Sequence, residues 1–275
     1  MKNIISLILA FSTVLFSAEG QTLSKETVLI ETNYGKIKVK LYEETPLHKA
    51  NFLKLVQEKV YDSLLFHRVI NDFMVQGGDL LSKRAKAGDS LGHGDMGYSI
   101  PAEFNSKLIH KKGGLAAARE SDDINPKFES SASQFYIVKG KIRSIEDLKK
   151  NEERINKTYY TNCARKFMKS EEGMKLKQKY SRLKAENKED SAIFVNAQIE
   201  AFIKTEYVKK PEYKFNKEQI DAYTSVGGTP HLDGTYTVFG EVIEGLDVLD
   251  KIIAVNTDKR DRPIKDIRMK MSVIK

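Results

Sequence analysis

The chain has 275 residues, of which 40% are hydrophobic and 31% are charged, and its formal net charge is +8. This hydrophobic share can fill a core, so a fully disordered chain is excluded, and the length suits one large domain or two modest ones. The single cysteine excludes an intramolecular disulfide and a thiolate-rich zinc or iron–sulfur site. Charges of both signs are mixed without a purely basic tract, so nucleic acid is not expected as the main partner.

The first twenty residues have the pattern of an export signal. Met1-Lys2-Asn3 gives a positive start, Ile4–Phe16 is mostly apolar, and Ala18-Glu19-Gly20 offers small residues for cleavage after Gly20. The apolar run is shorter than the roughly 20 residues of a membrane-spanning helix. An uncleaved anchor and a buried first helix are the alternatives. No cysteine lies near the expected cleavage site, so a lipid anchor is not expected. We predict that 1–20 is a signal peptide of an exported protein without stable membrane insertion, periplasmic where the cell has an outer membrane.

The next part of the chain alternates short apolar runs with turn residues. Val28–Ile30 and Ile37–Leu41 read as two strands joined at Asn33-Tyr34-Gly35, and Thr45-Pro46 begins a helix. Glycines separate the runs that follow. These further strand-like runs are 65–70, 73–77, 114–118 and 135–138. Such spacing predicts an antiparallel sheet or barrel.

The composition changes after Lys139. Between 141 and 226 the only glycine is Gly173 and the only proline is Pro211, and charge is dense. Helical spacing predicts four helices there, the first beginning at Ser144 and the last at Asn216.

Strand-like sequence resumes at 236–242, and a helix at 245–253 and a strand at 264–274 close the chain. We therefore predict a discontinuous β-rich domain, 21–138 and 227–275, interrupted by a helical insertion, 139–226. Cys163 is then an ordinary residue of an inserted helix.

Three segments carry candidate chemistry. In Phe66–Asp79, Arg68 alternates with apolar residues on a predicted strand, where an arginine needs an ion-pair partner or a functional reason. A structural ion pair on the sheet is the alternative. The second segment joins Gly113–Arg119 to Ser130–Val138, and the third is His231–Gly240. Taken singly, each is also compatible with ordinary strand-and-turn sequence.

Together, these segments resemble the signatures of the cyclophilin family of peptidyl-prolyl cis–trans isomerases. The matching stretches, in order, are Phe66-His67-Arg68-Val69-Ile70, Phe73-Met74, Gln76-Gly77-Gly78, Ser133-Gln134-Phe135-Tyr136-Ile137, Leu232-Asp233-Gly234 and Val238-Phe239-Gly240. The resemblance implies a mainly β fold, a closed eight-stranded antiparallel barrel capped by two helices. It covers 27–138 and 227–275, and the insertion has no counterpart in the minimal family.

The resemblance also implies the site. Arg68 matches the catalytic arginine, and Gln76 would support it and hydrogen-bond the substrate. Ala118 and Arg119 match the stretch whose backbone pairs with an extended peptide. Gln134 would flank the groove, and its remaining substrate-binding positions are Phe73, Met74, Tyr136, Leu232 and Tyr236. No cofactor and no metal are implied. His231 stands where many members carry a tryptophan that helps to bind cyclosporin, so cyclosporin should bind weakly.

The implied reaction is rotation about X–Pro peptide bonds in proline-containing, unfolded or extended polypeptides. The barrier of about 18–20 kcal/mol is lowered by binding the twisted amide better than the planar one, which needs no nucleophile, base or metal. The alternative is a module that binds proline-containing segments, with clients held by the insertion and incidental turnover. The insertion is otherwise a solvated helical appendage.

Overall fold

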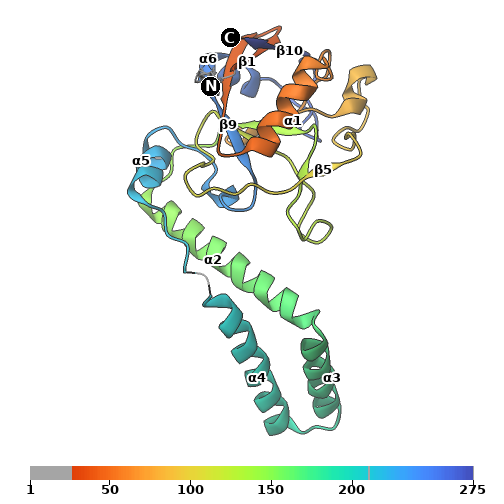
Figure 1. Cartoon of the computed structure of the whole chain (residues 1–275), viewed down its shortest axis with the longest axis vertical. Coiled ribbons are helices and arrows are strands. Elements are labelled where there is room, and N and C mark those ends of the chain that lie inside the picture. The colour runs from red at the N-terminus through yellow and green to blue at the C-terminus, as the bar shows by residue number, and fades with distance from the viewer. Residues whose placement is uncertain (1–26, 210, 275) are drawn as a thin grey trace, which may run out of the picture.

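The computed structural model describes residues 27–209 and 211–274. The predicted signal peptide, 1–20, lies outside the described residues. A body built around one sheet carries long helices that extend away from it (Figure 1). No helix within the described ranges has the length and apolar content that a membrane crossing needs.

The sheet is antiparallel, as predicted, and its strand order is β10-β1-β2-β9-β6-β8-β4-β3. Its strands are β1 (Thr27–Thr32), β2 (Gly35–Leu41), β3 (Phe66–Ile70), β4 (Met74–Gly77), β6 (Gly114–Ala117), β8 (Phe135–Val138), β9 (Val238–Glu244) and β10 (Met269–Ile274). A separate short pair joins β5 (Ser99–Ile100) to β7 (Ser130–Ser131). The mainly β prediction is confirmed, although β9 begins two residues later than expected and β10 five residues later.

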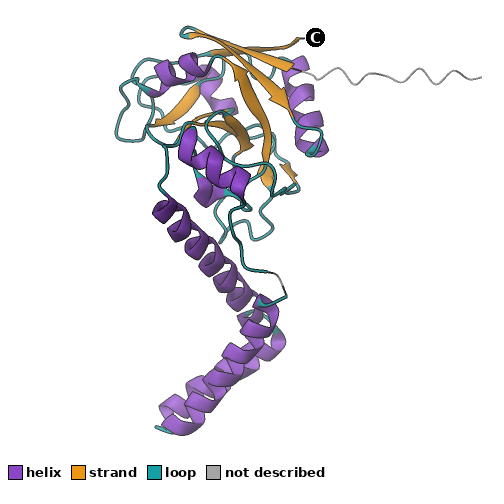
Figure 2. Ribbon diagram, turned by 90° about the vertical axis from the view of Figure 1, so that its left-hand side faces the viewer, coloured by secondary structure: helices purple, strands orange, loops and turns teal. Residues whose placement is uncertain are grey.

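The closed barrel is wrong: the sheet is curled but open between its outer strands, β3 and β10 (Figure 2). Their approach is limited to an isolated bridge between Leu65 and Arg268, with flanking backbone hydrogen bonds such as Phe66 N–H to Ile267 O at 2.9 Å. Ser63 has a φ of 70°, outside the extended region. The chain thus bends just before β3, and no continuous ladder joins β3 to β10.

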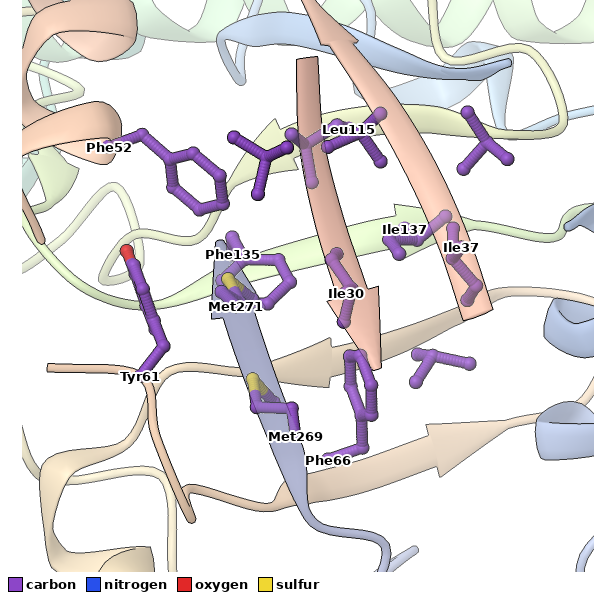
Figure 3. Close-up of a cluster of buried hydrophobic side chains, with 14 of the residues drawn as sticks. Ile30, Ile37, Phe52, Tyr61, Phe66, Leu115, Phe135, Ile137, Met269 and Met271 are labelled. Atoms are coloured by element: carbon purple, nitrogen blue, oxygen red, sulfur yellow. The ribbon is translucent and has the colours of Figure 1, made fainter. Parts of the chain in front are cut away.

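The two helices expected against the sheet are α1 (Pro46–Gln57) and α6 (Leu246–Ile253). Both bury apolar side chains in the main core with the strands. Figure 3 shows this core, in which aromatic rings and branched aliphatic side chains interdigitate. Along β8, Phe135 and Ile137 point into the main core while Tyr136 and Val138 join a second cluster on the other face. The candidate site lies on that other face.

Four α-helices lie between β8 and β9 in the described part of the chain: α2 (Ile145–Met168), α3 (Glu171–Ala185), α4 (Glu189–Tyr207) and α5 (Lys217–Ser225). The predicted starts at Ser144 and Asn216 are confirmed as capping boxes, in which each side chain accepts the backbone N–H three residues later. We call α2, α3 and α4 the helical arm. In Figures 1 and 2 it projects from the body, and α5 lies back against the body.

Candidate active site

Arg68 occupies β3 directly opposite Gln76 of β4. Its Nη1 donates to Gln76 Oε1 at 3.2 Å, and its Nε lies 3.7 Å from Asp261 Oδ2. The Arg68 and Asp261 side chains are 41% and 45% exposed, so the ion pair is weak. Arg68 therefore has an ion-pair partner, Asp261, as the structural alternative expects. It also has a hydrogen-bond partner on the neighbouring strand, Gln76, as the family resemblance implies.

A chain of amides continues from Arg68. Gln76 Nε2 donates to Gln134 Oε1 at 3.0 Å, and Gln134 Nε2 donates to the carbonyl oxygens of Gly92 and Gly94, also at 3.0 Å. Because a guanidinium only donates, this direction of bonding is the one that satisfies every amide in the series. The series fixes the guanidinium relative to the loop at 92–94.

Asp79 anchors that loop and was missed by the sequence analysis. Its buried carboxylate accepts the backbone N–H groups of Leu81, Gly92 and Gly94. The sequence did contain a signal for this role. Aspartate is a common helix cap, and Asp79 directly precedes the short helix η1 (Leu80–Arg84).

The predicted apolar positions meet in the second cluster, which we call the apolar cluster. Its buried members are Met74, Ala116, Tyr136, Val138 and Val238, and its half-buried members include Ile70, Phe73, Ala118, Leu232 and Tyr236. Phe73 stacks on His231, with ring centroids 5.9 Å apart. Leu232 and His231 come from the short helix η2 (Pro230–Leu232), which α2 contacts. The sequence-predicted pocket residues are thus brought together by β4, β6, β8 and η2.

Sheet register aligns Arg68 with this cluster. Cross-strand partners run Arg68, Gln76, Tyr136, Ala116 and Val238 across β3, β4, β8, β6 and β9. Cross-strand partners share one face of a sheet, and strands are about 4.8 Å apart. The arginine therefore lies two strands, on the order of 10 Å, from the Tyr136 position, with Gln76 between them.

Ala118 belongs to the apolar cluster and Arg119 follows it, and the predicted backbone pairing of these two residues with a peptide stays a prediction. The Ala118 N–H donates to Gln134 O at 2.9 Å, and its oxygen accepts the Ser131 N–H at 2.8 Å. Peptide pairing at Ala118 would have to replace or share these bonds. The Arg119 guanidinium lies over the rings of Tyr236 and Phe128, 4.4 and 4.7 Å from their centroids. The Arg119 side chain therefore covers one face of the Tyr236 ring.

Open space flanks the amide series on both sides. A cavity of about 530 Å³ is lined by Gln76, Gln134, Ala118 and Arg119 among others. A second, of about 220 Å³, is lined by His67, Arg68, Gln76 and Arg262 among others. An extended peptide crossing Gln76 would thus find room for side chains on either side.

Burial sets the charge state of the surrounding rings. It lowers the pKa of His67 to about 4 and that of His231 to about 4, the latter also through Arg154 and Arg143. Burial raises the pKa of Tyr136 well above its usual value. These three rings are uncharged at neutral pH, so Arg68 supplies positive charge next to an apolar surface. Within the described ranges, no group of three or more His, Cys, Asp or Glu side chains is arranged to hold a metal ion.

Comparison with known proteins identifies the family of the chain. A family model described as "Cyclophilin type peptidyl-prolyl cis-trans isomerase/CLD" matches residues 27–273. A Streptococcus pyogenes relative named putative bifunctional phosphatase/peptidyl-prolyl cis-trans isomerase is 29% identical over 246 residues, which cover 87% of this chain and 37% of that protein. A Staphylococcus haemolyticus putative peptidyl-prolyl cis-trans isomerase is 26% identical over 241 residues, covering 87% of this chain and 86% of the relative.

Solved structures show the same fold at low identity. A Cryptosporidium parvum cyclophilin-type peptidyl-prolyl cis-trans isomerase aligns with a TM-score of 0.51 and 19% identity, covering 91% of this chain and 98% of that one. Its crystal structure in the presence of the dipeptide Ala-Pro aligns with a TM-score of 0.50 and 20% identity, covering 90% and 99%. The present chain spans about a third of the streptococcal relative but most of the staphylococcal one.

Proposed function

The chain belongs to the cyclophilin-type peptidyl-prolyl cis–trans isomerase family and is an isomerase of that type, and we propose that Arg68 and the apolar cluster accelerate X–Pro rotation in exported polypeptides. The observation that carries the proposal is the register row from Arg68 through Gln76 to Tyr136. This row supports the proposal because a peptide whose proline ring lay on the cluster would extend toward the charged donor on β3. The exported context rests on the pattern of residues 1–20.

The chemistry follows from amide resonance. Rotation breaks the partial double bond and returns the lone pair to the prolyl nitrogen, so a donor aimed there stabilises the twisted amide more than the planar one. A charged hydrogen bond contributes roughly 1.5–3 kcal/mol. A 10⁴-fold acceleration needs roughly 5–6 kcal/mol. The remainder would come from removing water around the amide, which the apolar cluster favours.

The proposed substrates are proline-containing unfolded or extended polypeptides. Support comes from the half-buried Phe73, Leu232 and Tyr236, whose exposed parts give a proline ring an apolar contact surface. The structural neighbour studied with Ala-Pro is consistent with this class of ligand. We also propose weak cyclosporin binding, because His231 offers a smaller apolar surface than a tryptophan.

Substitution of Arg68 tests the mechanism. We expect Arg68→Ala and Arg68→Lys to lower kcat/KM for an X–Pro peptide by about 100-fold or more, since lysine keeps the charge but not the planar fork. Thermal unfolding should show both variants folded. Arg182→Ala is the matched control, because Arg182 is exposed on α3 and lies outside both the register row and the cavities of the candidate site. Near wild-type turnover in either Arg68 variant would refute the mechanism.

A second function is favoured by the surface of the helical arm. Ile193 and Phe194 of α4 are each 64% exposed, and Met174 of α3 is 49% exposed. The segment 139–226 also has a net positive charge. We propose that this segment is an insertion into the discontinuous domain 21–138 and 227–275, and that it holds unfolded clients. If it does not, the arm is a solvated appendage.

A further inference from the structure

A buried polar chain links α5 to the apolar cluster. Tyr223 Oη lies 2.6 Å from Asp233 Oδ2, and Asp233 Oδ1 lies 2.8 Å from His110 Nδ1. On the other side of the imidazole, His110 Nε2 lies 3.0 Å from Tyr136 Oη. All four residues are at most 5% exposed. These bonds join residues 110, 136, 223 and 233 into one continuous path.

Donors and acceptors along this path can be assigned. A carboxylate only accepts, so Asp233 accepts from the Tyr223 hydroxyl, from His110 Nδ1–H and from the His110 backbone N–H, 3.0 Å away. In the neutral imidazole Nε2 is then the acceptor, and the Tyr136 hydroxyl donates to it. The buried carboxylate is thus compensated by three donors, and removing one weakens its hold on the others.

The Tyr136 end of the path belongs to the apolar cluster. Tyr136 lies beside Tyr236 with ring centroids 6.1 Å apart, and His110 lies 6.5 Å from the same ring. Because Tyr136 is tied at its hydroxyl, its ring cannot tilt without breaking the bond to His110. The path therefore fixes the position of the Tyr136 ring and supports the position of the Tyr236 ring.

The Tyr223 end belongs to the base of the helical arm. Tyr223 packs in a separate buried cluster with Leu148 of α2 and Phe215. Its carbonyl oxygen accepts the Arg143 N–H at 2.9 Å, just before α2 begins. A displacement of the first turns of α2 would therefore move Tyr223.

We propose that Tyr223, Asp233 and His110 are positioning residues that hold the Tyr136 ring, so that the base of the helical arm and the proline-binding surface are coupled. This inference rests on the proposed function for its catalytic consequence, but the coupling itself is a property of the fold. In the proposed function, Tyr136 is part of the surface that would hold the proline ring in the planar and twisted amide alike. A loosened ring therefore weakens binding of both forms, which raises KM more than it lowers kcat.

The test is a double-mutant cycle on X–Pro peptide turnover. We expect Tyr223→Phe to raise KM about fivefold with kcat changed less than twofold, and Tyr136→Phe to do the same. The double variant should be no worse than either single one, because both break the same path. Tyr160→Phe is the matched control, since it removes a tyrosine hydroxyl from the exposed side of α2. Additive effects in the double variant, or an unchanged KM in Tyr223→Phe, would overturn the inference.

A measurement without turnover separates this inference from the proposed function. In protein labelled at the tyrosine ring carbons, the Tyr136 NMR signals should shift in Tyr223→Phe and stay unchanged in Tyr160→Phe. If the signals shift but the wild-type protein has no turnover, the proposed function fails and the coupling stands. If the Tyr136 signals are the same in Tyr223→Phe and wild type, the coupling fails whatever the activity.

Discussion

Arg68 keeps donor capacity for a ligand while being held in place. A guanidinium carries five N–H donors. The contacts from described residues engage Nη1, through Gln76, and Nε, through Asp261, and none engages Nη2. A fully paired arginine would have to break bonds to bind a peptide. This one has only a weak, half-exposed ion pair to exchange, so it is oriented by the sheet and still available to substrate.

His67, the residue before Arg68, makes the free energy of unfolding depend on pH. Burial holds its pKa near 4 in the folded protein, whereas the unfolded chain protonates near 6.5. Between these values the unfolded state binds more protons, so stability falls as pH drops from 6.5 to 4. We expect His67→Phe to remove up to about 3 kcal/mol of this loss, measured by urea unfolding at pH 7 and pH 4.5. His231 contributes in the same direction, so some slope should remain. Equal slopes in variant and wild type would contradict the assignment.

At the scale of elements, Gly78 follows the last residue of β4 and lets the chain pass close to the residues just before β8. Gly78 has a φ of +92°, and a Cβ there would lie 2.0 Å from the Ser133 carbonyl oxygen. Gly88 is a matched control, because its φ is +87° and a Cβ there would meet nothing within 4 Å. We expect Gly88→Ala to cost about 1–2 kcal/mol of unfolding free energy from backbone strain and Gly78→Ala about twice that. Thermal and urea unfolding measure the difference. Equal losses would mean that β8 moves away from β4 at little cost.

Local sequence predicted most of these elements, and tertiary geometry explains the exceptions. The hairpin of β1 and β2 and the capping boxes at Ser144 and Asn216 depend on neighbours in sequence, so pattern was sufficient. Barrel closure would need β3 and β10 to pair along their length, and local periodicity does not reveal that only an isolated bridge between Leu65 and Arg268 forms there. The strand expected from 264 begins at Met269 because the preceding residues form a loop bridged at Thr257 and Pro263.

The candidate site likewise has a part that the sequence predicted and a part that only the structure shows. Arg68, Gln76 and the apolar positions followed from motif resemblance, and register then explains why they share one face. The path through His110 and Tyr223 could not be predicted, because its members come from separate elements and no spacing links them. A buried histidine reads in sequence as an ordinary core residue. Its partners Asp233 and Tyr136 are distant in sequence, and Tyr223 joins the path only where α5 packs against the body.

At the scale of the whole molecule, the described residues form several separate apolar cores. The main core and the apolar cluster belong to the sheet body, whereas the arm has its own core around Leu183, Val195 and Ile199. The base cluster around Leu148 and Tyr223 lies between them. Since the far part of the arm is held by its own core, its surface can change without disturbing the candidate active site.

That separation makes client holding by the arm testable on its own. We expect Ile193→Ser combined with Phe194→Ser to reduce the ability of the full chain to suppress aggregation of an unfolded protein by half or more, because these exposed side chains offer an apolar contact surface. X–Pro peptide turnover should be unchanged. The matched control is Ile264→Ser combined with Leu81→Ser, which removes apolar side chains of similar exposure, 67% and 59%, from the body. Light scattering with a denatured client measures the effect. Unchanged suppression in the arm variant, or the same loss in the control, would leave the arm as a solvated appendage and X–Pro isomerisation as the molecule's function.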